Sequence, residues 1–231
     1  MADRPYTILS CGISLDGYLD AGTPDRLVLS NEADLRRVDA VRAESDAILV
    51  GAATVRHDHP RLLVRTAELR DQRRRQGLPE SPMKVTVTES GCLDRDNSFF
   101  TTGASEKLVY CESRSVTCVR DRLAGVATVI DAGRPVDLAD VVGDLELRGV
   151  RSLMVEGGGR IHTQFLTQGL ADELHLVVAP FFVGDTRAQR FVNAGAFPWN
   201  PGHRAHLAET RQIGDVVLLR YALSSRFAEV S

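Results

Sequence analysis

Short apolar runs, bounded by glycine, proline or polar residues, recur along the chain and are typical of buried strands. They occupy residues 6–13, 47–50, 84–88, 107–110, 126–130, 152–155, 173–179, 206–212 and 216–221. The last two runs are joined at Ile213-Gly214-Asp215, which predicts a β-hairpin.

Segments with apolar residues at helical spacing lie between several of these strands. Ser30 or Asn31 can cap a helix that continues to about Ser45. We expect its buried face to carry Leu35, Val38 and Val41. Two further helices are predicted at 136–147, through Leu138, Val141, Val142 and Leu145, and at 160–169, through Ile161, Phe165 and Leu166.

The order of these elements predicts an α/β fold with a mostly parallel central sheet, flanking helices and a C-terminal antiparallel hairpin. The sequence has no internal repeat and no Ser/Gly-rich linker, so we expect residues 1–231 to form a single domain. Residues 51–54 open a turn and a short helix, and 57–63 is irregular around Pro60. The polar, basic stretch 66–82 is expected to be a solvent-exposed helix or loop.

Composition narrows the class of protein. Hydrophobic residues make up 43% of the chain and the net charge is −3, which argues against a nucleic-acid or anionic-membrane partner. No signal peptide or membrane span is visible, so a cytoplasmic location is expected. The four cysteines form no C-x-x-C pair and none has a histidine at zinc-ligand spacing, so we interpret them as free thiols.

The sequence Leu-Met-Val-Glu-Gly-Gly-Gly at 153–159 is the strongest functional signal. It places Glu156 at the tip of a predicted strand and the glycines in the turn into a helix. Ligands of open α/β sheets bind at the carboxyl ends of strands, and a helix start suits a phosphate. The alternative is a tight turn that binds nothing.

Two further segments add to this signal. The first is Ser-Leu-Asp-Gly at 14–17, and the second combines Thr54-Val55 with Asp58, Pro60, Leu62 and Arg65. With Glu-Gly-Gly-Gly and the later Leu-Ala-Asp-Glu-Leu at 170–174, Ala179-Pro180 and Gly184, the set resembles the pyrimidine reductases of riboflavin biosynthesis. That group includes the C-terminal half of bacterial riboflavin deaminase-reductases.

The resemblance implies a dihydrofolate-reductase-like fold, use of NADPH and a homodimer. It implies that the cofactor is bound by Gly12, Thr54, Asp58, Ser90, Gly158, Gly159, Arg160, Ile161, His162 and Thr163. It assigns the substrate to Arg42, Leu62, Arg65 and Glu156, where arginine forks suit a 5′-phosphate and Glu156 suits the N–H groups of a diaminopyrimidine.

Plainer readings exist for several of these residues. Arg42 could face solvent, Asp16 could only form a turn, and Thr54 could only cap a helix. The scattered histidines favour local hydrogen bonds over a metal site.

Two departures from the family pattern matter. The zinc-deaminase signature is absent, so we expect neither deaminase activity nor catalytic zinc, and the family's Asp-Ser after the third strand reads Thr88-Glu89-Ser90.

The implied activity is NADPH-dependent reduction of a phosphoribosylaminopyrimidine to its ribitylamino product, by hydride transfer to ribose C1′. Asp58 and Glu156 are the candidate catalytic residues, and either could deliver a proton. The order of reduction and deamination stays open. Two alternatives remain: a reductase of a pterin or other heterocycle on the same fold, and a non-catalytic nucleotide-binding protein.

Overall fold

A computed structural model gives the structure of this protein and describes residues 4–23 and 27–227. Its backbone contacts form two compact units. Among the described residues, the first unit contains Arg4, Pro5 and Val38–Met154, and the second contains residues 6–23, 27–37 and 155–227.

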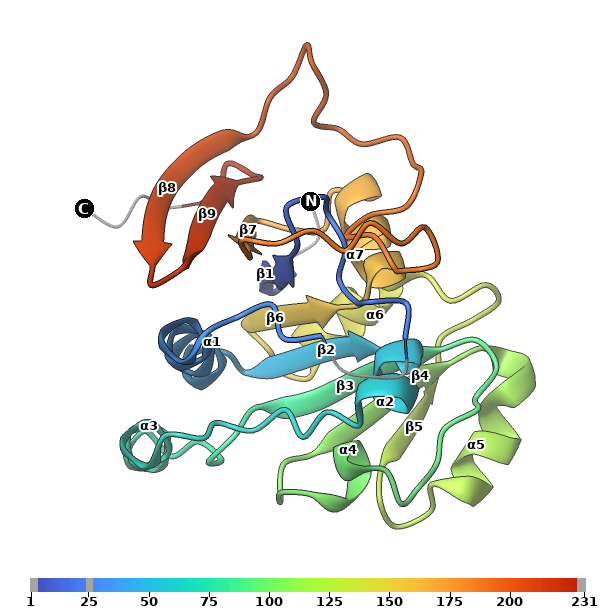
Figure 1. Ribbon diagram of the computed structural model, residues 1–231. Helices are drawn as coiled ribbons and strands as arrows, with labels where there is room; N and C mark the ends of the chain where they lie inside the picture. Colours follow the sequence, from blue (N-terminus) through green and yellow to red (C-terminus); the bar gives the residue numbers. More distant parts are fainter. Residues whose placement is uncertain (1–3, 24–26, 228–231) are drawn as a thin grey trace. The chain divides into compact units, whose positions relative to one another are not determined.

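The first unit is built on four parallel strands: β2 (Ala47–Gly51), β3 (Met83–Thr88), β4 (Lys107–Cys111) and β5 (Thr128–Asp131) (Figure 1). Because neighbouring strands are parallel, their carboxyl ends lie at one edge. The helical segments of this unit are α2 (Ala52–Asp58), α3 (Ala67–Arg75), α4 (Ser98–Thr101), η1 (Ser113–Ser115), α5 (Val116–Arg122) and α6 (Leu138–Leu147).

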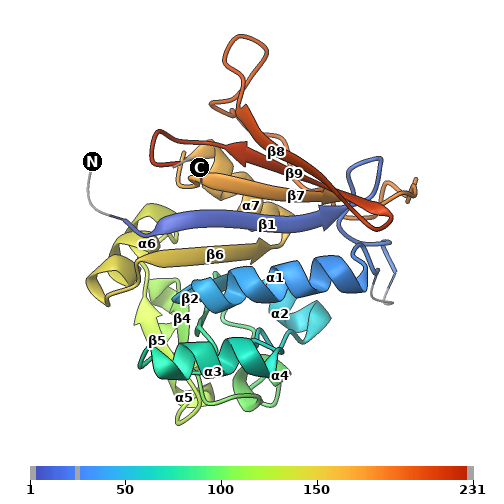
Figure 2. The same ribbon diagram turned by 90° about the vertical axis from the view of Figure 1, so that its left-hand side faces the viewer.

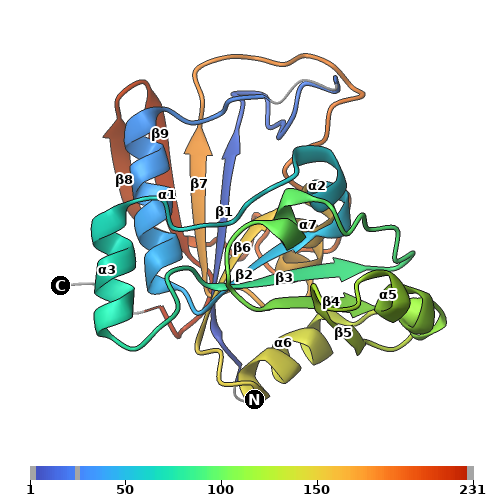
Figure 3. The same ribbon diagram turned by 90° about the horizontal axis from the view of Figure 1, so that it is seen from below.

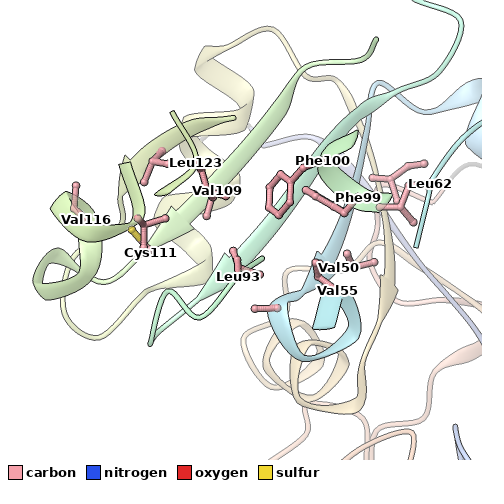
Figure 4. Packing of buried hydrophobic residues seen from close by; sticks show 14 of the residues in the cluster. Val50, Val55, Leu62, Leu93, Phe99, Phe100, Val109, Cys111, Val116 and Leu123 are labelled. Carbon is pink, nitrogen blue, oxygen red and sulfur yellow. The ribbon is translucent and has the colours of Figure 1, made fainter. Parts of the chain in front are cut away.

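The core of this unit explains the apolar runs. Every residue of β2 is buried, as expected for a parallel strand covered on both faces, and its sequence is therefore continuously apolar. Figure 4 shows Val50 and Val55 beside Phe99, with the cluster continuing to Val109 and Leu123. The predicted apolar positions of α6 are all buried, and Asp137 caps this helix by accepting the N–H of Ala139 at 2.9 Å.

The second unit contains β1 (Tyr6–Ile13), α7 (Gly159–Thr167), β7 (Glu173–Val178), β8 (His206–Ile213) and β9 (Val216–Ala222). β1 pairs in parallel with β7, which pairs antiparallel with β9, and β9 with β8 (Figure 2). The predicted C-terminal hairpin is confirmed. Ile161, Phe165 and Leu166 of α7 are buried, as their spacing predicts.

Two elements contribute residues to both units: α1 (Glu32–Glu44) and β6 (Ser152–Gly157). Asn31 caps α1, because its Oδ1 accepts the N–H of Asp34 at 2.9 Å. Within the described residues, nine strands follow the order β5-β4-β3-β2-β6-β1-β7-β9-β8 in a sheet. The α/β class, the mostly parallel sheet and the antiparallel C-terminal end are therefore confirmed. The single-domain expectation stays a prediction.

The prediction that Leu35 is buried is wrong, and one residue of the basic stretch 66–82 departs from its prediction. Leu35 is 37% exposed, whereas Asp34 and Asp39 of the same helix are buried, because side-chain and backbone donors satisfy both carboxylates. The stretch 66–82 contains α3 and is mostly exposed, as expected, but Arg73 within it is only 2% exposed. α3 lies beside the second half of α1 (Figure 3), where Arg73 donates to the carbonyls of Ala43 and Ser45, each at 2.8 Å.

The sequence pattern also missed α5. Its buried apolar residues, Val116 and Val119, are separated by threonine and cysteine and followed by charged residues, so no clear helical stripe marks it.

Candidate functional site

Thr54 and Asp58 lie four residues apart on α2 and therefore share one helix face. α2 begins at Ala52, with Gly51 as the N-cap, so Thr54 is inside the helix and the interpretation of Thr54 as a cap is wrong. Asp58 is exposed, and its Oδ1 lies 3.0 Å from Nδ1 of His57. The helix thus offers a hydroxyl and a carboxylate side by side at the carboxyl end of β2.

Leu62 and Arg65 follow in the connection from α2 to α3. Leu62 is 3% exposed, has φ of 47°, and packs in the hydrophobic core near Phe99 (Figure 4). Its side chain therefore has a packing role, and contact with a substrate stays a prediction. Arg65 is exposed, and its guanidinium makes no hydrogen bond or ion pair within the described residues.

Arg42 does not simply face solvent. It is half-buried on α1, and its Nη1 donates to the carbonyl of Leu63 at 3.1 Å. Arg42 thus contacts the segment that carries Arg65. The structure brings the two predicted substrate arginines to one part of the first unit.

Asp39 is a residue that the sequence analysis did not single out. It is 4% exposed, and its two oxygens accept the N–H groups of Arg65 at 2.7 Å and Thr66 at 2.8 Å. Burial raises the pKa of this carboxyl, but hydrogen bonds from Thr66 and Arg65 and the charge of Arg42 outweigh burial and hold the pKa below its usual range. The only sequence signal is its position three residues before Arg42 on the same helix.

Ser90 lies in the turn after β3, and its side chain is exposed. A hydrogen bond closes this turn, because Thr88 Oγ1 accepts the N–H of Gly91 at 3.0 Å, and Gly91 has φ of +67°. A Cβ on Gly91 would lie 2.3 Å from Cγ2 of Val119, so only glycine lets this turn approach α5. Ser90 therefore lies in a hydrogen-bonded turn that packs against α5 at the carboxyl end of β3.

In the second unit, Gly12 lies on β1 opposite Val177 of β7. A Cβ on Gly12 would lie 2.9 Å from Cβ of Leu29. The close approach of Leu29 therefore already requires glycine at this position, independently of any cofactor.

Glu156 is the penultimate residue of β6 and is half-buried, close to the strand tip that the sequence predicts. Gly158 is the N-cap of α7, where neither a side-chain cap nor an acidic residue in the first turn competes for the backbone N–H groups. A Cβ on Gly159 would lie 2.3 Å from the carbonyl oxygen of Arg190, so this turn must be glycine. An anion would meet the positive end of α7 here.

The buried side chains of α7 narrow the predicted cofactor contacts. Ile161, His162 and Thr163 are all buried, and Thr163 Oγ1 donates to the carbonyl of Gly159 at 2.6 Å. Only Gly158 and Arg160 of the stretch 158–163 are not buried. Within this stretch, the surface open to a cofactor is therefore Gly158, Arg160 and the backbone at the helix start.

His162 is fully buried, and neither ring nitrogen has a hydrogen-bond partner among the described residues. Its ring centroid lies 5.5 Å from that of Phe191. Burial lowers the pKa of His162 to about 4, so the imidazole is neutral at pH 7.

Asp16 lies in a turn, but its carboxylate does more than form that turn, because it also binds a segment far along the chain. Its carboxylate accepts the N–H groups of Val183 at 3.0 Å and Gly184 at 2.8 Å, and the hydroxyl of Ser14 at 2.6 Å. The bond from Ser14 and those from the backbone lower the pKa of Asp16 to about 2. The Ser-Leu-Asp-Gly motif and Gly184 therefore belong to the same structural contact, in which the Asp16 carboxylate binds the backbone at Val183 and Gly184.

Other site types find no support in the described part of the chain. Residues 4–23 and 27–227 contain no group of three or more His, Cys, Asp or Glu side chains that could hold a metal ion. Across the same residues, no helix is long and apolar enough to cross a membrane. All four cysteines are free.

Comparison with known proteins gives a consistent result. The profile of the family described as RibD C-terminal domain matches residues 5–219. The chain is 35% identical over 190 residues to a 2,5-diamino-6-ribosylamino-4(3H)-pyrimidinone 5′-phosphate reductase of Archaeoglobus fulgidus, covering 78% of this chain and 83% of the relative. It is 30% identical over 221 residues to the reductase of the same name from Methanothermobacter thermautotrophicus, covering 95% and 99%.

A crystal structure of a pyrimidine reductase-like protein from Corynebacterium diphtheriae superposes with a TM-score of 0.79. The match covers 94% of this chain and 91% of that protein, at 22% sequence identity. The likeness confirms the dihydrofolate-reductase-like fold expected from the sequence.

Proposed function

Because the chain belongs to the RibD C-terminal domain family, we propose that it is an oxidoreductase of riboflavin biosynthesis that reduces a phosphoribosylaminopyrimidine to the ribitylamino product. The observation that carries this proposal is the pair Arg42 and Arg65. Arg65 presents an exposed guanidinium without a partner in the described residues, on a segment that Arg42 also contacts. Such a fork suits a phosphate.

The substrate roles follow from the chemistry of each group. Arg65 and Arg42 hold the 5′-phosphate. Glu156, half-buried at the end of β6, accepts N–H bonds from the pyrimidine amino groups. Leu62 supplies an apolar contact at the substrate.

The cofactor roles fit the donors present. The uncapped start of α7 offers backbone N–H groups at Gly158 to Arg160 for a pyrophosphate. Thr54 and Asp58 share a helix face and can hydrogen-bond a carboxamide or ribose, while Ser90 and Gly12 contact the remainder of the cofactor. A bound nicotinamide supplies the hydride, and the protein supplies position and electrostatics. Asp58 or Glu156 delivers the proton.

Three finer assignments complete the proposal: the cofactor is NADPH and not NADH, the protein is a homodimer, and it works in the cytoplasm. The substrate form is the 2,5-diamino compound, so that reduction precedes deamination. The names of the archaeal relatives support this order, because each of these reductases is named for a pyrimidinone that still carries its 2-amino group.

The test is NADPH consumption with a panel of the diamino compound, its deaminated uracil analogue, and a dihydropterin. We expect the highest kcat/KM with the diamino compound and a lower kcat/KM with NADH. Highest turnover of the pterin would support a pterin reductase instead. Cofactor binding without turnover of any compound would support a non-catalytic nucleotide-binding protein.

A further inference from the structure

The segment Leu63–Thr66 has an unusual source of hydrogen bonds. It belongs to no strand, yet side chains satisfy most of its backbone. Ser81 Oγ accepts the N–H of Val64 at 3.0 Å, and Arg70 Nη1 donates to the carbonyls of Val64, at 3.2 Å, and Arg65. With the bonds from Arg42 and Asp39 described above, four side chains hold this segment. We call Asp39, Arg42, Arg70 and Ser81 the cradle.

The cradle holds the backbone of Arg65, and so the point from which its side chain extends. Val64, the preceding residue, is 1% exposed, and the N–H groups of Arg65 and Thr66 end on one buried carboxylate. Hydrogen bonds to a charged group are stronger than neutral ones. The connection from α2 to α3 runs past α1 (Figure 3), so Asp39 of α1 can bind the backbone of this connection. We call a carboxylate that accepts two successive backbone N–H groups in this way a clamp. The backbone of Arg65 is thereby held while its guanidinium stays exposed.

We propose that Asp39 and Arg70 are positioning residues for substrate binding: they hold the backbone of Arg65 so that its guanidinium is presented to the substrate phosphate in one place. This inference rests on the proposed substrate role of Arg65. A preorganised arginine loses less conformational freedom on binding, so the cradle acts on substrate affinity. It acts neither on cofactor affinity nor on the hydride-transfer step.

A second clamp of the same chemistry provides a matched control. Asp46 accepts the N–H groups of Arg151 at 2.8 Å and Ser152 at 2.9 Å. Like Asp39, it joins two successive backbone N–H groups to one carboxylate, and neither Arg151 nor Ser152 has a proposed ligand role. Both bonds end on Oδ2 of Asp46, and asparagine retains one such oxygen, so the control variant that removes this clamp is Asp46→Ala. Arg74, one turn after Arg70 on α3, pairs with Asp71 and Glu80 and controls for loss of an arginine from that helix.

The first experiment measures substrate KM, kcat and the NADPH dissociation constant for Asp39→Asn, Arg65→Ala, the double variant and Asp46→Ala. An asparagine offers one acceptor oxygen for two N–H groups, so we expect Asp39→Asn to raise KM by about tenfold or more. We expect the dissociation constant for NADPH to stay within twofold. On the Arg65→Ala background, Asp39→Asn should add less than twofold, because the group it positions is gone.

Additive effects of Asp39→Asn and Arg65→Ala would overturn the proposal, as would an equal rise in KM for Asp46→Ala. If Asp39→Asn does not fold, Arg70→Met tests the same idea against Arg74→Met. Arg70→Met should raise KM and Arg74→Met should not. Equal KM values for these two variants would also overturn it.

Amide hydrogen exchange separates this inference from the proposed function, because it needs no substrate. We expect the amides of Arg65 and Thr66 to be protected in the wild type and to exchange faster in Asp39→Asn. Fast exchange in the wild type would refute the clamp. Absence of turnover in a wild type with protected amides would instead refute the proposed function, and with it the positioning role.

Discussion

Replacing His162 by leucine should remove a pH dependence of stability. The imidazole is fully buried, and neither nitrogen has a partner in the described residues, so the folded protein strongly disfavours its charged form. Burial lowers its pKa from 6.5 to about 4. Between these values the unfolded chain binds a proton that the folded protein does not.

The size of the effect follows from this difference. Because the folded-state pKa of His162 is the lower one, this residue does not reduce the free energy of unfolding at pH values well above 6.5. The free energy of unfolding then falls as the pH drops from 6.5 toward 4, because the unfolded chain binds the proton first. The linkage relation gives a loss of about 2 kcal/mol between pH 7 and pH 5 from this residue. Leucine has a similar volume and no titratable group, so the variant lacks this loss.

The assay is urea unfolding of wild type and His162→Leu at pH 7 and pH 5, without cofactor. The difference between the unfolding free energies of the two proteins at each pH removes the contribution of all other titratable groups. We expect His162→Leu to gain about 2 kcal/mol relative to wild type on going from pH 7 to pH 5. A difference that does not change with pH would instead mean that His162 is solvated or partnered in the folded protein.

Four further outcomes are expected. Glu156→Gln should keep the NADPH dissociation constant but lower kcat/KM by roughly tenfold to a thousandfold, since it loses a charged hydrogen bond; wild-type turnover would remove Glu156 from the site. Arg65→Lys keeps the charge without the fork, so substrate KM should rise while NADPH affinity, measured by fluorescence, stays constant; the reverse pattern would move Arg65 to the cofactor. Gly159→Ala should cost roughly 1–3 kcal/mol in urea unfolding, because its Cβ would lie 2.3 Å from a backbone oxygen; an unchanged midpoint would contradict that contact. If residues 1–231 are a single domain, calorimetry should record one cooperative transition, and two separate transitions would contradict this.

Much of the fold could be predicted because burial on both faces of a parallel sheet produces continuous apolar runs. Ala47–Val50 shows this most clearly, and the register of α6 followed from its apolar stripe. Arg73 could not be predicted, because its partners are carbonyl oxygens, and any residue supplies a carbonyl. The exposure of Leu35 has a related cause, since buried Asp34 takes part of the helix face that apolar spacing assigned to leucine.

The candidate site divides in the same way. The residue types at Thr54, Asp58, Arg65 and Glu156 signalled their chemistry, through charge, spacing and resemblance. The support of that chemistry was invisible, because Asp39 acts on backbone N–H groups 26 and 27 residues along the chain. Nothing in the sequence marks these N–H groups as needing a carboxylate.

We propose that this protein transfers a hydride to the ribose carbon of a phosphoribosylaminopyrimidine. The most direct test uses NADPH deuterated at nicotinamide C4, on the transferred face, with the 2,5-diamino compound as substrate. We predict a ribitylamino product that carries the deuterium on C1′, seen by mass spectrometry and NMR. NADPH oxidation without deuterium in the sugar chain, or no oxidation with this substrate while a dihydropterin is reduced, would rule out this reaction.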